Sequence, residues 1–332
     1  MRAVICTSFN GIDALEFGEL ADPVPGPGQV LVDVHAAALS FMDTLMVAGR
    51  YQMKPALPFV PGSDAAGVVL AIGDGVQRVS VGDRVASSHW HGGMAERMVA
   101  PESSVVKLPD GVSFEVGSTV RYAYGTARYA LATRAQLRPG ETVFVSGAAG
   151  GVGMAAIDVA RQMGATVIAG TGSAAKGEVA RKQGAAHAVD YSCEPVRDRL
   201  LELTQGRGVD VYFDNVGGSL FGTVSRAMAW GGRILPIGFT SGEVPSLAMN
   251  LPLLKNYSVV GCYWGAWVER EPQQSRAADE QIFAAVAQGF LRPQVSDVLP
   301  MSSFANGLQR LARRQVTGRV VLRVKQNADA FA

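Results

Sequence analysis

Several features that would place this chain in a common class of protein are missing from its sequence. Cysteine is scarce: Cys6, Cys193 and Cys262 are odd in number and form no CxxC pair, which predicts neither a disulfide framework nor a cysteine-rich zinc site. Charge of one sign is also missing, because 30 Lys+Arg stand against 29 Asp+Glu. A net charge of +1 provides no field that would attract nucleic acid or an anionic membrane, and we expect neither as a partner.

Long hydrophobic runs are absent as well. The longest uncharged run, residues 142–157, is rich in glycine and shorter than the roughly 20 apolar residues of a membrane span. The opening residues MRAVICTSF lack the apolar stretch and cleavage site of a signal peptide. We therefore expect a cytoplasmic protein.

The residues that are present predict a well-packed protein of two domains. Hydrophobic residues make up 48% of the 332 residues and charged residues 18%, which is typical of a folded globular chain. Its length corresponds to about two domains at roughly 150 residues each.

The first third of the chain reads as short strands separated by Gly/Pro turns. Val30, Val32 and Val34 recur at period two, the spacing of a half-buried strand. RAVIC, DAAGVVLAIG and DRVASS are further strands, and one helix is expected to start at Ser40 as its N-cap and to run to residue 49. So many short strands predict a compact, barrel-like β domain.

From about residue 141 the pattern changes to strands alternating with helices. Helices are predicted over 151–163, 174–183, 195–204 and 219–229. They separate the apolar strands TVFVS, TVIAG, HAVDY, VDVYFDN, GRILPIG and YSVVGCYW, and this alternation predicts a doubly wound parallel sheet. The last forty residues add a helix over 304–313 and the strand RVVLRV, which we expect to return to the first domain.

A glycine-rich turn stands between TVFVS and the next helix. Its glycines allow a tight turn, a close approach of backbone N–H groups to a pyrophosphate, and close packing of helix on strand. The N-terminus of the helix adds about half a positive charge directed at the phosphates. The glycines are Gly147, Gly150, Gly151 and Gly153.

The end of the second strand of this alternation indicates which dinucleotide is bound. An NAD site normally has Asp or Glu about 20 residues after the glycine turn, to hold the ribose 2′-hydroxyl. Here residues 170–173 read GTGS, and the first acid is Glu178, inside the following helix. A hydroxyl, free N–H groups and the ammonium of Lys176 suit a 2′-phosphate, so NADPH is the expected cofactor.

No metal is expected. The first domain contains Cys6, His35, His89 and His91, without a cluster of three or four candidate ligands. His89 and His91 form an H-x-H pair without an obvious third partner, and we interpret them as loop or pocket-wall residues. The chemistry is therefore expected to be that of the cofactor.

Taken together, the motifs resemble the medium-chain dehydrogenase/reductase superfamily, specifically its zinc-independent NADPH:quinone oxidoreductase (zeta-crystallin-like) branch. Zinc-dependent members carry a Cys near positions 39–40 and Gly-His-Glu near 62–64, where this chain has Leu39-Ser40 and Gly62-Ser63-Asp64. The resemblance extends over essentially the whole chain and rests on the stretches PGPGQVLVDVHAAALSFMDTLMVAGRYQMKPALPFVPGSDAAGVV, VGDRV, YGTARYAL, GAAGGVG, GVDVYFDNVGG, WGGRILPIGF, LLKNYSVVGCYWG and TGRVVL.

The resemblance implies an α/β protein with a GroES-like β-barrel domain, a Rossmann domain inserted between its two parts and a cleft between the domains. We expect residues 1–120 and 290–332 to form the GroES-like substrate domain and 121–289 the NADPH-binding domain. The implied cofactor-binding residues, expected at carboxyl ends of strands or at helix starts, are Gly150, Gly151, Val152 and Gly153 for the pyrophosphate, Ser173, Lys176 and Tyr191 for the 2′-phosphate, and Thr126, Asn215, Phe239, Tyr263 and Trp264 around the nicotinamide.

Two residues are implied in catalysis. Tyr51 matches the active-site tyrosine of related enoyl-thioester reductases, and its phenol would hydrogen-bond the substrate carbonyl. The alternative interpretation of Tyr51 is a pocket-wall aromatic. Ser40 stands where relatives have an asparagine, and its shorter hydroxyl would contact the nicotinamide ribose. Relatives carry a proline in the segment ahead of YGTA, where this chain has Arg121-Tyr122-Ala123. Arg121 is interpreted as a solvated helix residue or as a cation facing an anionic substrate.

The expected function is NADPH-dependent hydride transfer to a quinone. Reduction of a 2-enoyl thioester or another α,β-unsaturated carbonyl is the alternative, for which Lys54, Arg121 or Lys255 would supply basic residues. A second alternative is an NADPH-binding protein without catalysis. The resemblance also implies a homodimer, in which YSVVGCYW pairs as an edge strand with its twin.

Overall fold

The computed structural model describes residues 1–325, and the contacts within it divide the chain into two compact units. Unit 1 comprises Met1–Tyr122, Pro272–Gln288 and the chain from Pro293 onward. Unit 2 comprises Ala123–Glu271 and Gly289–Arg292. By contacts, residues 272–288 thus lie with unit 1, whereas the expected division placed them in the NADPH-binding domain. The expected domain boundaries themselves stay a prediction.

Unit 1 is built on strands from both ends of the chain. Among the described residues, its larger sheet has seven strands in the order β14-β15-β3-β4-β5-β7, with β6 paired to β3, and β1 and β2 form a separate antiparallel pair. The strands are β1 (Arg2–Cys6), β2 (Leu15–Glu19), β3 (Gln29–Ala38), β4 (Asp64–Ile72), β5 (Arg84–Ser88), β6 (Arg97–Pro101), β7 (Val105–Lys107), β14 (Val295–Pro300) and β15 (Arg319–Arg323). Its helices are α1 (Phe41–Val47), α9 (Pro272–Ala287), α10 (Phe304–Ala312) and the start of α2 (Phe114–Arg128), with short 3-10 turns η1 (Ile12–Ala14), η2 (Glu102–Ser104) and η4 (Met301–Ser303).

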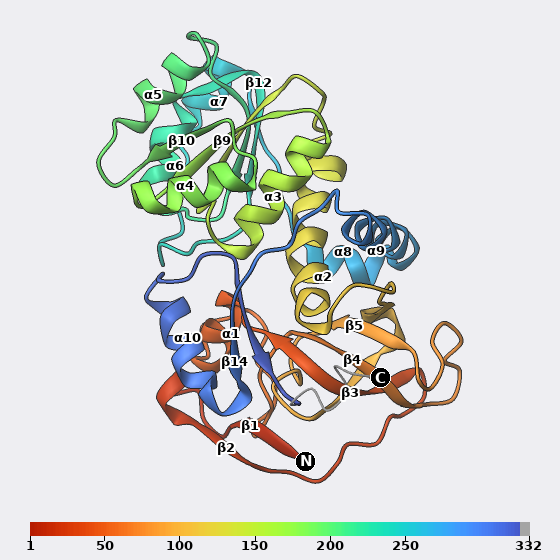
Figure 1. Cartoon of the computed structure of the whole chain (residues 1–332). Helices are drawn as coiled ribbons and strands as arrows, with labels where there is room; N and C mark the ends of the chain where they lie inside the picture. Colours follow the sequence, from red (N-terminus) through yellow and green to blue (C-terminus); the bar gives the residue numbers. More distant parts are fainter. Residues whose placement is uncertain (326–332) are drawn as a thin grey trace. The chain divides into compact units, whose positions relative to one another are not determined.

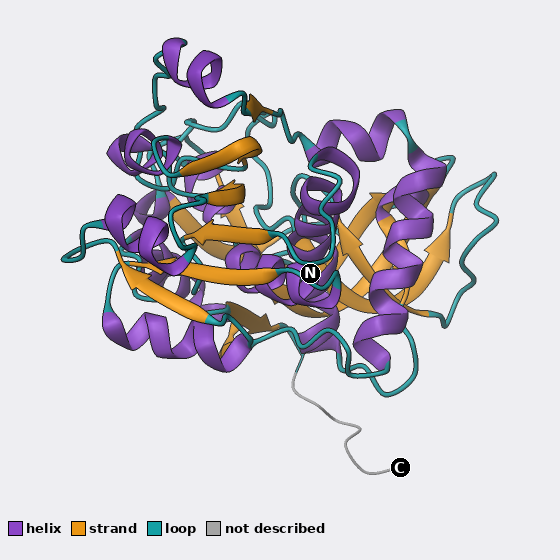
Figure 2. Cartoon of the chain, turned by 90° about the horizontal axis from the view of Figure 1, so that it is seen from above, coloured by secondary structure: helices purple, strands orange, loops and turns teal. Residues whose placement is uncertain are grey.

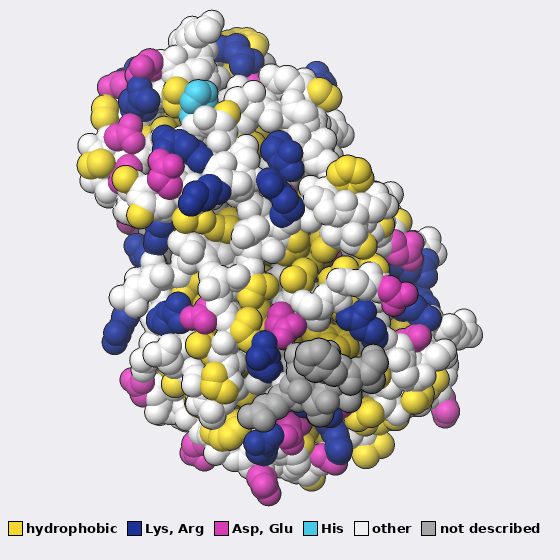
Figure 3. Space-filling view, in the orientation of Figure 1, with side chains coloured by type: hydrophobic (Ala, Val, Ile, Leu, Met, Phe, Trp, Pro, Cys, Tyr) yellow, Lys and Arg dark blue, Asp and Glu magenta, His cyan; other side chains and the backbone are white. Residues whose placement is uncertain are grey.

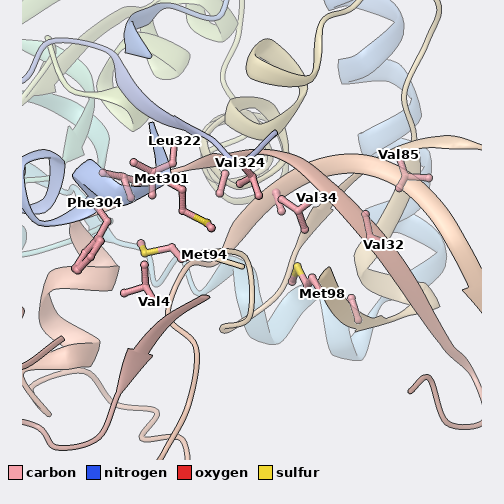
Figure 4. Close-up of a cluster of buried hydrophobic side chains, with 14 of the residues drawn as sticks. Val4, Val32, Val34, Val85, Met94, Met98, Met301, Phe304, Leu322 and Val324 are labelled. Carbon is pink, nitrogen blue, oxygen red and sulfur yellow. The ribbon is translucent and has the colours of Figure 1, made fainter. Parts of the chain in front are cut away.

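The core of unit 1 explains why these distant segments belong together. Val30, Val32 and Val34 of β3 are completely buried, as their period-two spacing predicts. Around them pack side chains from β1, α10 and β15, and Figure 4 shows them meeting in one cluster. The expected return of RVVLRV to the first domain is confirmed, since β15 pairs antiparallel with β3.

Unit 2 contains the predicted doubly wound sheet. Its six parallel strands, all within the described residues, run in the order β10-β9-β8-β11-β12-β13. Figures 1 and 2 show helices on both faces of this sheet. The strands are β8 (Thr142–Ser146), β9 (Thr166–Thr171), β10 (His187–Asp190), β11 (Val209–Asp214), β12 (Met228–Pro236) and β13 (Ser258–Val259). The helices are the end of α2, the π-helical turn η3 (Tyr129–Arg134), α3 (Gly151–Gln162), α4 (Ala174–Gln183), α5 (Val196–Leu203), α6 (Gly218–Ser225), α7 (Asn250–Lys255) and α8 (Trp264–Arg270).

Two predictions about unit 2 are wrong in extent. The helix expected over 219–229 ends at Ser225, because the Ala227 carbonyl already accepts from Val209 N–H of β11 and the chain continues as β12. The strand expected at YSVVGCYW is only Ser258–Val259, since the chain turns into α8 from Tyr263.

Two further observations concern the charges on the surface and the length and apolarity of the helices. On the face drawn in Figure 3, acidic and basic side chains are interspersed. Within residues 1–325, no helix combines the length and the apolarity needed to cross a membrane.

Candidate functional site

The glycine turn lies where ligands bind to open parallel sheets. From β8 the chain passes to its neighbour β9, while its other neighbour, β11, follows later in the chain, so the strand order reverses between β8 and β11. Directly after β8 comes the turn at Gly147, with φ of 61°, and α3 then begins with Gly150 as its N-cap.

The space around this turn accepts only glycine at one position. A Cβ on Gly153 would lie 2.4 Å from the Gly147 carbonyl oxygen. The close approach places the first turn of α3, with Gly151, Val152 and Gly153, against the turn. N–H groups in a first helical turn have no acceptor within the helix. Together with the helix dipole, they fit a pyrophosphate.

A second corner forms at the end of β9. Gly172 follows this strand, and a Cβ there would lie 3.3 Å from the ring of Tyr191. Ser173 caps α4, with its hydroxyl accepting from Lys176 N–H at 3.3 Å. Tyr191 is fixed by its own N–H, which donates to the Thr171 carbonyl. Ser173, Tyr191 and the backbone of Lys176 are thus brought to one corner, which fits a 2′-phosphate.

An acid that was not predicted from the sequence, Asp190, also lies at this corner. Asp190 ends β10, and its Oδ1 accepts from Ser192 N–H at 3.0 Å and from the Ser192 hydroxyl at 2.6 Å. These bonds, with a further one from Ala174 N–H at the start of α4, lower the pKa of the Asp190 carboxyl. Its sequence signal is an Asp at the end of a strand and two residues before a Ser, which is typical of an Asx turn.

The carboxyl end of β11 is held by a buried hydrogen-bond cluster. Asp214 Oδ1 accepts from the hydroxyls of Ser146 and Tyr212, at 2.7 Å each. Ser146 Oγ also accepts from Asn215 N–H at 3.0 Å, and Asn215 Nδ2 donates to the Ser146 carbonyl at 2.9 Å. Asn215, which was predicted from sequence, is therefore oriented by Ser146 and Asp214, which were not.

The remaining predicted nicotinamide residues lie in different surroundings. Thr126 stands in the last turns of α2 and is buried, so the expectation that every such residue lies at a strand end or helix start is wrong for it. Trp264, at the start of α8, is also buried: a Cβ on Gly125 would lie 2.8 Å from its indole nitrogen. Phe239 and Tyr263, by contrast, are 39% and 49% exposed.

In unit 1, Ser40 caps α1 as predicted. Its hydroxyl accepts from Asp43 N–H and donates to Asp43 Oδ2, and Ser40 N–H donates to the same oxygen at 2.7 Å. Asp43 is completely buried, and burial raises the pKa of its carboxyl to about 6. A contact of Ser40 with the nicotinamide ribose stays a prediction.

Tyr51 lies among aromatic side chains. Its ring centroid is 6.4 Å from that of Trp90, and both rings pack against a buried cluster that consists of Cys6, Met42, Met46, Val47 and Phe59. Tyr51 and Trp90 are both half-buried. A phenol on an apolar support is suited to hydrogen-bond a substrate oxygen.

At the positions that hold zinc in zinc-dependent relatives, the side chains of this protein make other contacts. The Ser40 hydroxyl caps α1, and Asp64 Oδ2 accepts from Arg319 Nη2 at 2.5 Å. Within residues 1–325, no group of three His, Cys, Asp or Glu side chains is placed to hold a metal ion. The donor set at these positions does not fit zinc.

Arg121 contradicts both interpretations made from the sequence. It is 2% exposed, and its Nε donates to Asp279 Oδ2 of α9 at 2.9 Å. Its Nη1 and Nη2 donate to the carbonyls of Ser88 and Ser103. Arg121 is therefore neither solvated nor a cation facing a substrate, because all three nitrogens bind within unit 1.

Comparison with known proteins agrees with this geometry. The family model "Alcohol dehydrogenase GroES-like domain" matches residues 26–110, and "Zinc-binding dehydrogenase" matches residues 151–280. The chain is 37% identical to the Mus musculus protein "Quinone oxidoreductase-like protein 2", over 98% of this chain and 92% of that protein. The chain belongs to the medium-chain dehydrogenase/reductase superfamily. The predicted family and fold class, a GroES-like domain with a Rossmann sheet, are confirmed.

Solved members of this superfamily are similar along nearly the whole chain. The quinone oxidoreductase of Pseudomonas syringae matches with a TM-score of 0.90 and 32% identity, covering 97% of this chain and 99% of that one. The Escherichia coli quinone oxidoreductase, solved in complex with NADPH, matches with a TM-score of 0.89 and 25% identity, covering 98% and 100%. The chain is thus a quinone oxidoreductase-like member of the medium-chain dehydrogenase/reductase superfamily.

Proposed function

We propose that this chain is a zinc-independent, NADPH-dependent reductase that transfers a hydride to a quinone. The observation that carries the proposal is a pair of corners in unit 2 that suit anions: the first turn of α3 after Gly147, and the Ser173–Lys176–Tyr191 corner. Residues 170–173 at the end of β9 contain no acid, and the Asp190 carboxylate at this corner accepts hydrogen bonds from Ser192 and Ala174. A dinucleotide with a 2′-phosphate satisfies both corners. The NADPH found in the E. coli relative supports the same cofactor.

Each group has a distinct task in this proposal. Bound NADPH supplies the hydride. The N–H groups at the start of α3 bind the pyrophosphate, while the Ser173 hydroxyl and the Lys176 ammonium bind the 2′-phosphate. Asn215 is held by Ser146 so that its amide can orient the nicotinamide ribose. Tyr51 donates a hydrogen bond to the acceptor oxygen, which gains negative charge as the hydride arrives. A proton from solvent then completes the hydroquinone.

The basic residues favour a neutral acceptor over an acyl-CoA. Arg121 is buried and paired with Asp279. Lys255 Nζ donates to the Met228 carbonyl, and burial lowers the pKa of its ammonium. Lys54, three residues after Tyr51, is exposed, and it is the feature that favours the enoyl-thioester alternative.

The proposal is tested by NADPH consumption with 1,4-naphthoquinone and with crotonyl-CoA, assayed in parallel. The expected result is a higher kcat/KM for the quinone, and Tyr51→Phe is expected to lower kcat by about tenfold or more through the lost hydrogen bond. A preference for crotonyl-CoA would establish the enoyl-thioester reductase instead. Binding of NADPH without turnover of either acceptor would leave the non-catalytic alternative.

We also propose a homodimer formed through β13, an edge strand of the unit 2 sheet. Val259 of β13 is 42% exposed, and two apolar side chains shortly before the strand, Leu253 and Leu254, are 80% and 68% exposed. An open apolar edge favours pairing with another strand. Light scattering at micromolar concentration should give the mass of a dimer, and a monomeric mass would contradict this part of the proposal.

A further inference from the structure

The loop that follows β5 presents three aromatic side chains in sequence, His89, Trp90 and His91. Two of its backbone groups are fixed at its ends: His89 N–H donates to the Ser63 carbonyl and Gly92 N–H to the Val60 carbonyl, both at 2.8 Å. The next residues continue the pairing, with Gly93 N–H donating to the Gly62 carbonyl. These backbone hydrogen bonds hold the loop, and with it the three aromatic rings, in place.

These rings join Tyr51 and Phe59 in an aromatic wall, the name used here for Tyr51, Phe59, His89, Trp90 and His91. The centroids of Tyr51 and Trp90 are 6.4 Å apart, those of Phe59 and His91 are 5.9 Å apart, and those of His89 and His91 are 5.8 Å apart. Except for the buried Phe59, the members are half-buried. The ring contacts form two groups, Tyr51 with Trp90 and His91 with both Phe59 and His89, and Tyr51 and Trp90 pack against the buried cluster that contains Phe59. Part of the surface of every member except Phe59 stays accessible.

The aromatic wall also carries hydrogen-bonding groups, the imidazole nitrogens of His89 and His91. Burial lowers the pKa of His89 to about 4, with smaller contributions from His91 and Arg121. Burial also lowers the pKa of His91. Both imidazoles are neutral at pH 7, so they offer N–H donors and nitrogen acceptors without a charge.

A surface of this kind discriminates between acceptors. A planar aromatic quinone can stack on the accessible part of the Trp90 ring, and the wall carries neutral hydrogen-bond donors suited to carbonyl oxygens. A linear unsaturated carbonyl has no ring to stack and gains only the hydrogen bond to its single oxygen. Neutral imidazoles also give no attraction to the phosphates of an acyl-CoA.

We propose that the aromatic wall binds the ring of a neutral aromatic acceptor and that Trp90 sets the preference for quinones over linear unsaturated carbonyls. This inference rests on the proposed reductase function and adds to it the residue that selects the acceptor. Trp90 acts in specificity through stacking, and Tyr51 keeps its role at the acceptor oxygen.

The test compares Trp90→Ala and Trp90→Phe with the wild-type protein, using NADPH with 1,4-naphthoquinone and with trans-2-hexenal. Trp90→Ala is expected to lower kcat/KM for the quinone about tenfold or more, mainly by raising KM, and to change the value for hexenal less than about threefold. Trp90→Phe keeps a ring and is expected to stay within about threefold of wild type for both acceptors. Trp230→Ala, which removes a 75% exposed indole of unit 2, is the matched control.

Equal losses for both acceptors in Trp90→Ala, or no loss for the quinone, would overturn the inference. NADPH affinity and thermal unfolding establish that the variant is folded, and Trp90→Leu replaces it if it is not. If the wild-type protein reduces neither acceptor, the proposed function fails. Calorimetric binding of naphthoquinone to wild type and variant then still tests the wall, and equal affinities would overturn it.

Discussion

The Ser146 hydroxyl donates to Asp214 Oδ1 over 2.7 Å and ties together the carboxyl ends of β8 and β11. These strands stand on either side of the point where the strand order reverses. The same carboxylate oxygen also accepts from the Tyr212 hydroxyl and from the N–H groups of Val216 and Gly217. One buried aspartate therefore fixes the turn that carries Asn215.

Replacing Asp214 should destabilise the protein strongly. Asp214→Ala leaves the donors on Ser146, Tyr212, Val216 and Gly217 without their shared acceptor, and we expect the free energy of unfolding to fall by about 3 kcal/mol. Tyr212→Phe removes only one donor and should cost about 1 kcal/mol. Urea unfolding of both variants measures these values. Equal effects of the two substitutions would show that Asp214 is not the centre of the cluster.

A methyl group on Gly153 should weaken NADPH binding. It would meet the Gly147 carbonyl oxygen at 2.4 Å and push the first turn of α3 away from the turn. We expect Gly153→Ala to raise the Kd for NADPH about tenfold or more, measured by fluorescence titration. Gly222→Ala in α6 is the control, because its nearest neighbour would be Arg226 Nη1 at 3.7 Å. Unchanged affinity in Gly153→Ala would count against the α3 site.

Lys176 should distinguish the two dinucleotides. Lys176→Ala removes the ammonium proposed to bind the 2′-phosphate, and the Kd for NADPH should rise about tenfold while the Kd for NADH stays unchanged. Lys182→Ala, in the exposed last turn of the same helix, should change neither value. If Lys176→Ala weakens both cofactors equally, the residue acts on the fold of α4 and not on the 2′-phosphate.

Asp43 should make the stability depend on pH in a defined direction. Burial raises the pKa of its carboxyl in the folded state to about 6, from an ordinary value of 3.8. The folded protein therefore binds this proton more tightly than the unfolded chain, and the stabilisation is present at low pH and lost as pH rises to about 6. Between pH 4.5 and 7 the loss amounts to about 2 kcal/mol.

Asp43→Asn removes this titration and is compared with the wild-type protein by urea unfolding at several pH values. The difference between the two free energies of unfolding should change by that amount over the interval and remain constant above pH 7. A constant difference throughout would show that Asp43 is not titrating in this range.

Removing only Arg121 from the Arg121–Asp279 pair should lower the free energy of unfolding more than replacing both residues by apolar ones. Arg121→Met leaves the Asp279 carboxylate buried without its guanidinium, with an expected cost of about 3 to 5 kcal/mol. The double variant Arg121→Met with Asp279→Leu should be more stable than Arg121→Met alone, since no buried charge is left unpaired. A double variant less stable than the single one would contradict this account.

Much of the fold could be predicted because the signals are local. The period-two spacing of Val30, Val32 and Val34 predicts β3, and the alternation of apolar runs with helical segments predicts the parallel sheet of unit 2. Ser40 as N-cap follows from its side chain and from Asp43 three residues later.

What could not be predicted depends on partners far away in the chain. Arg121 reads as a solvated helix residue or as a substrate-facing cation until Asp279, 158 residues later, is placed beside it. Ser146 and Asp214 are 68 residues apart, and only the pairing of β11 with β8 makes them neighbours. The aromatic wall likewise combines three consecutive residues, His89, Trp90 and His91, with Tyr51 and Phe59, which lie at least 30 residues earlier in the chain.

The measurement that tests the central claim most directly is the consumption of NADPH and of NADH by the wild-type protein, with 1,4-naphthoquinone as acceptor. The account predicts sustained turnover, with kcat/KM for NADPH at least about tenfold above that for NADH. Binding of NADPH without its consumption, or an equal or higher kcat/KM for NADH, would contradict it.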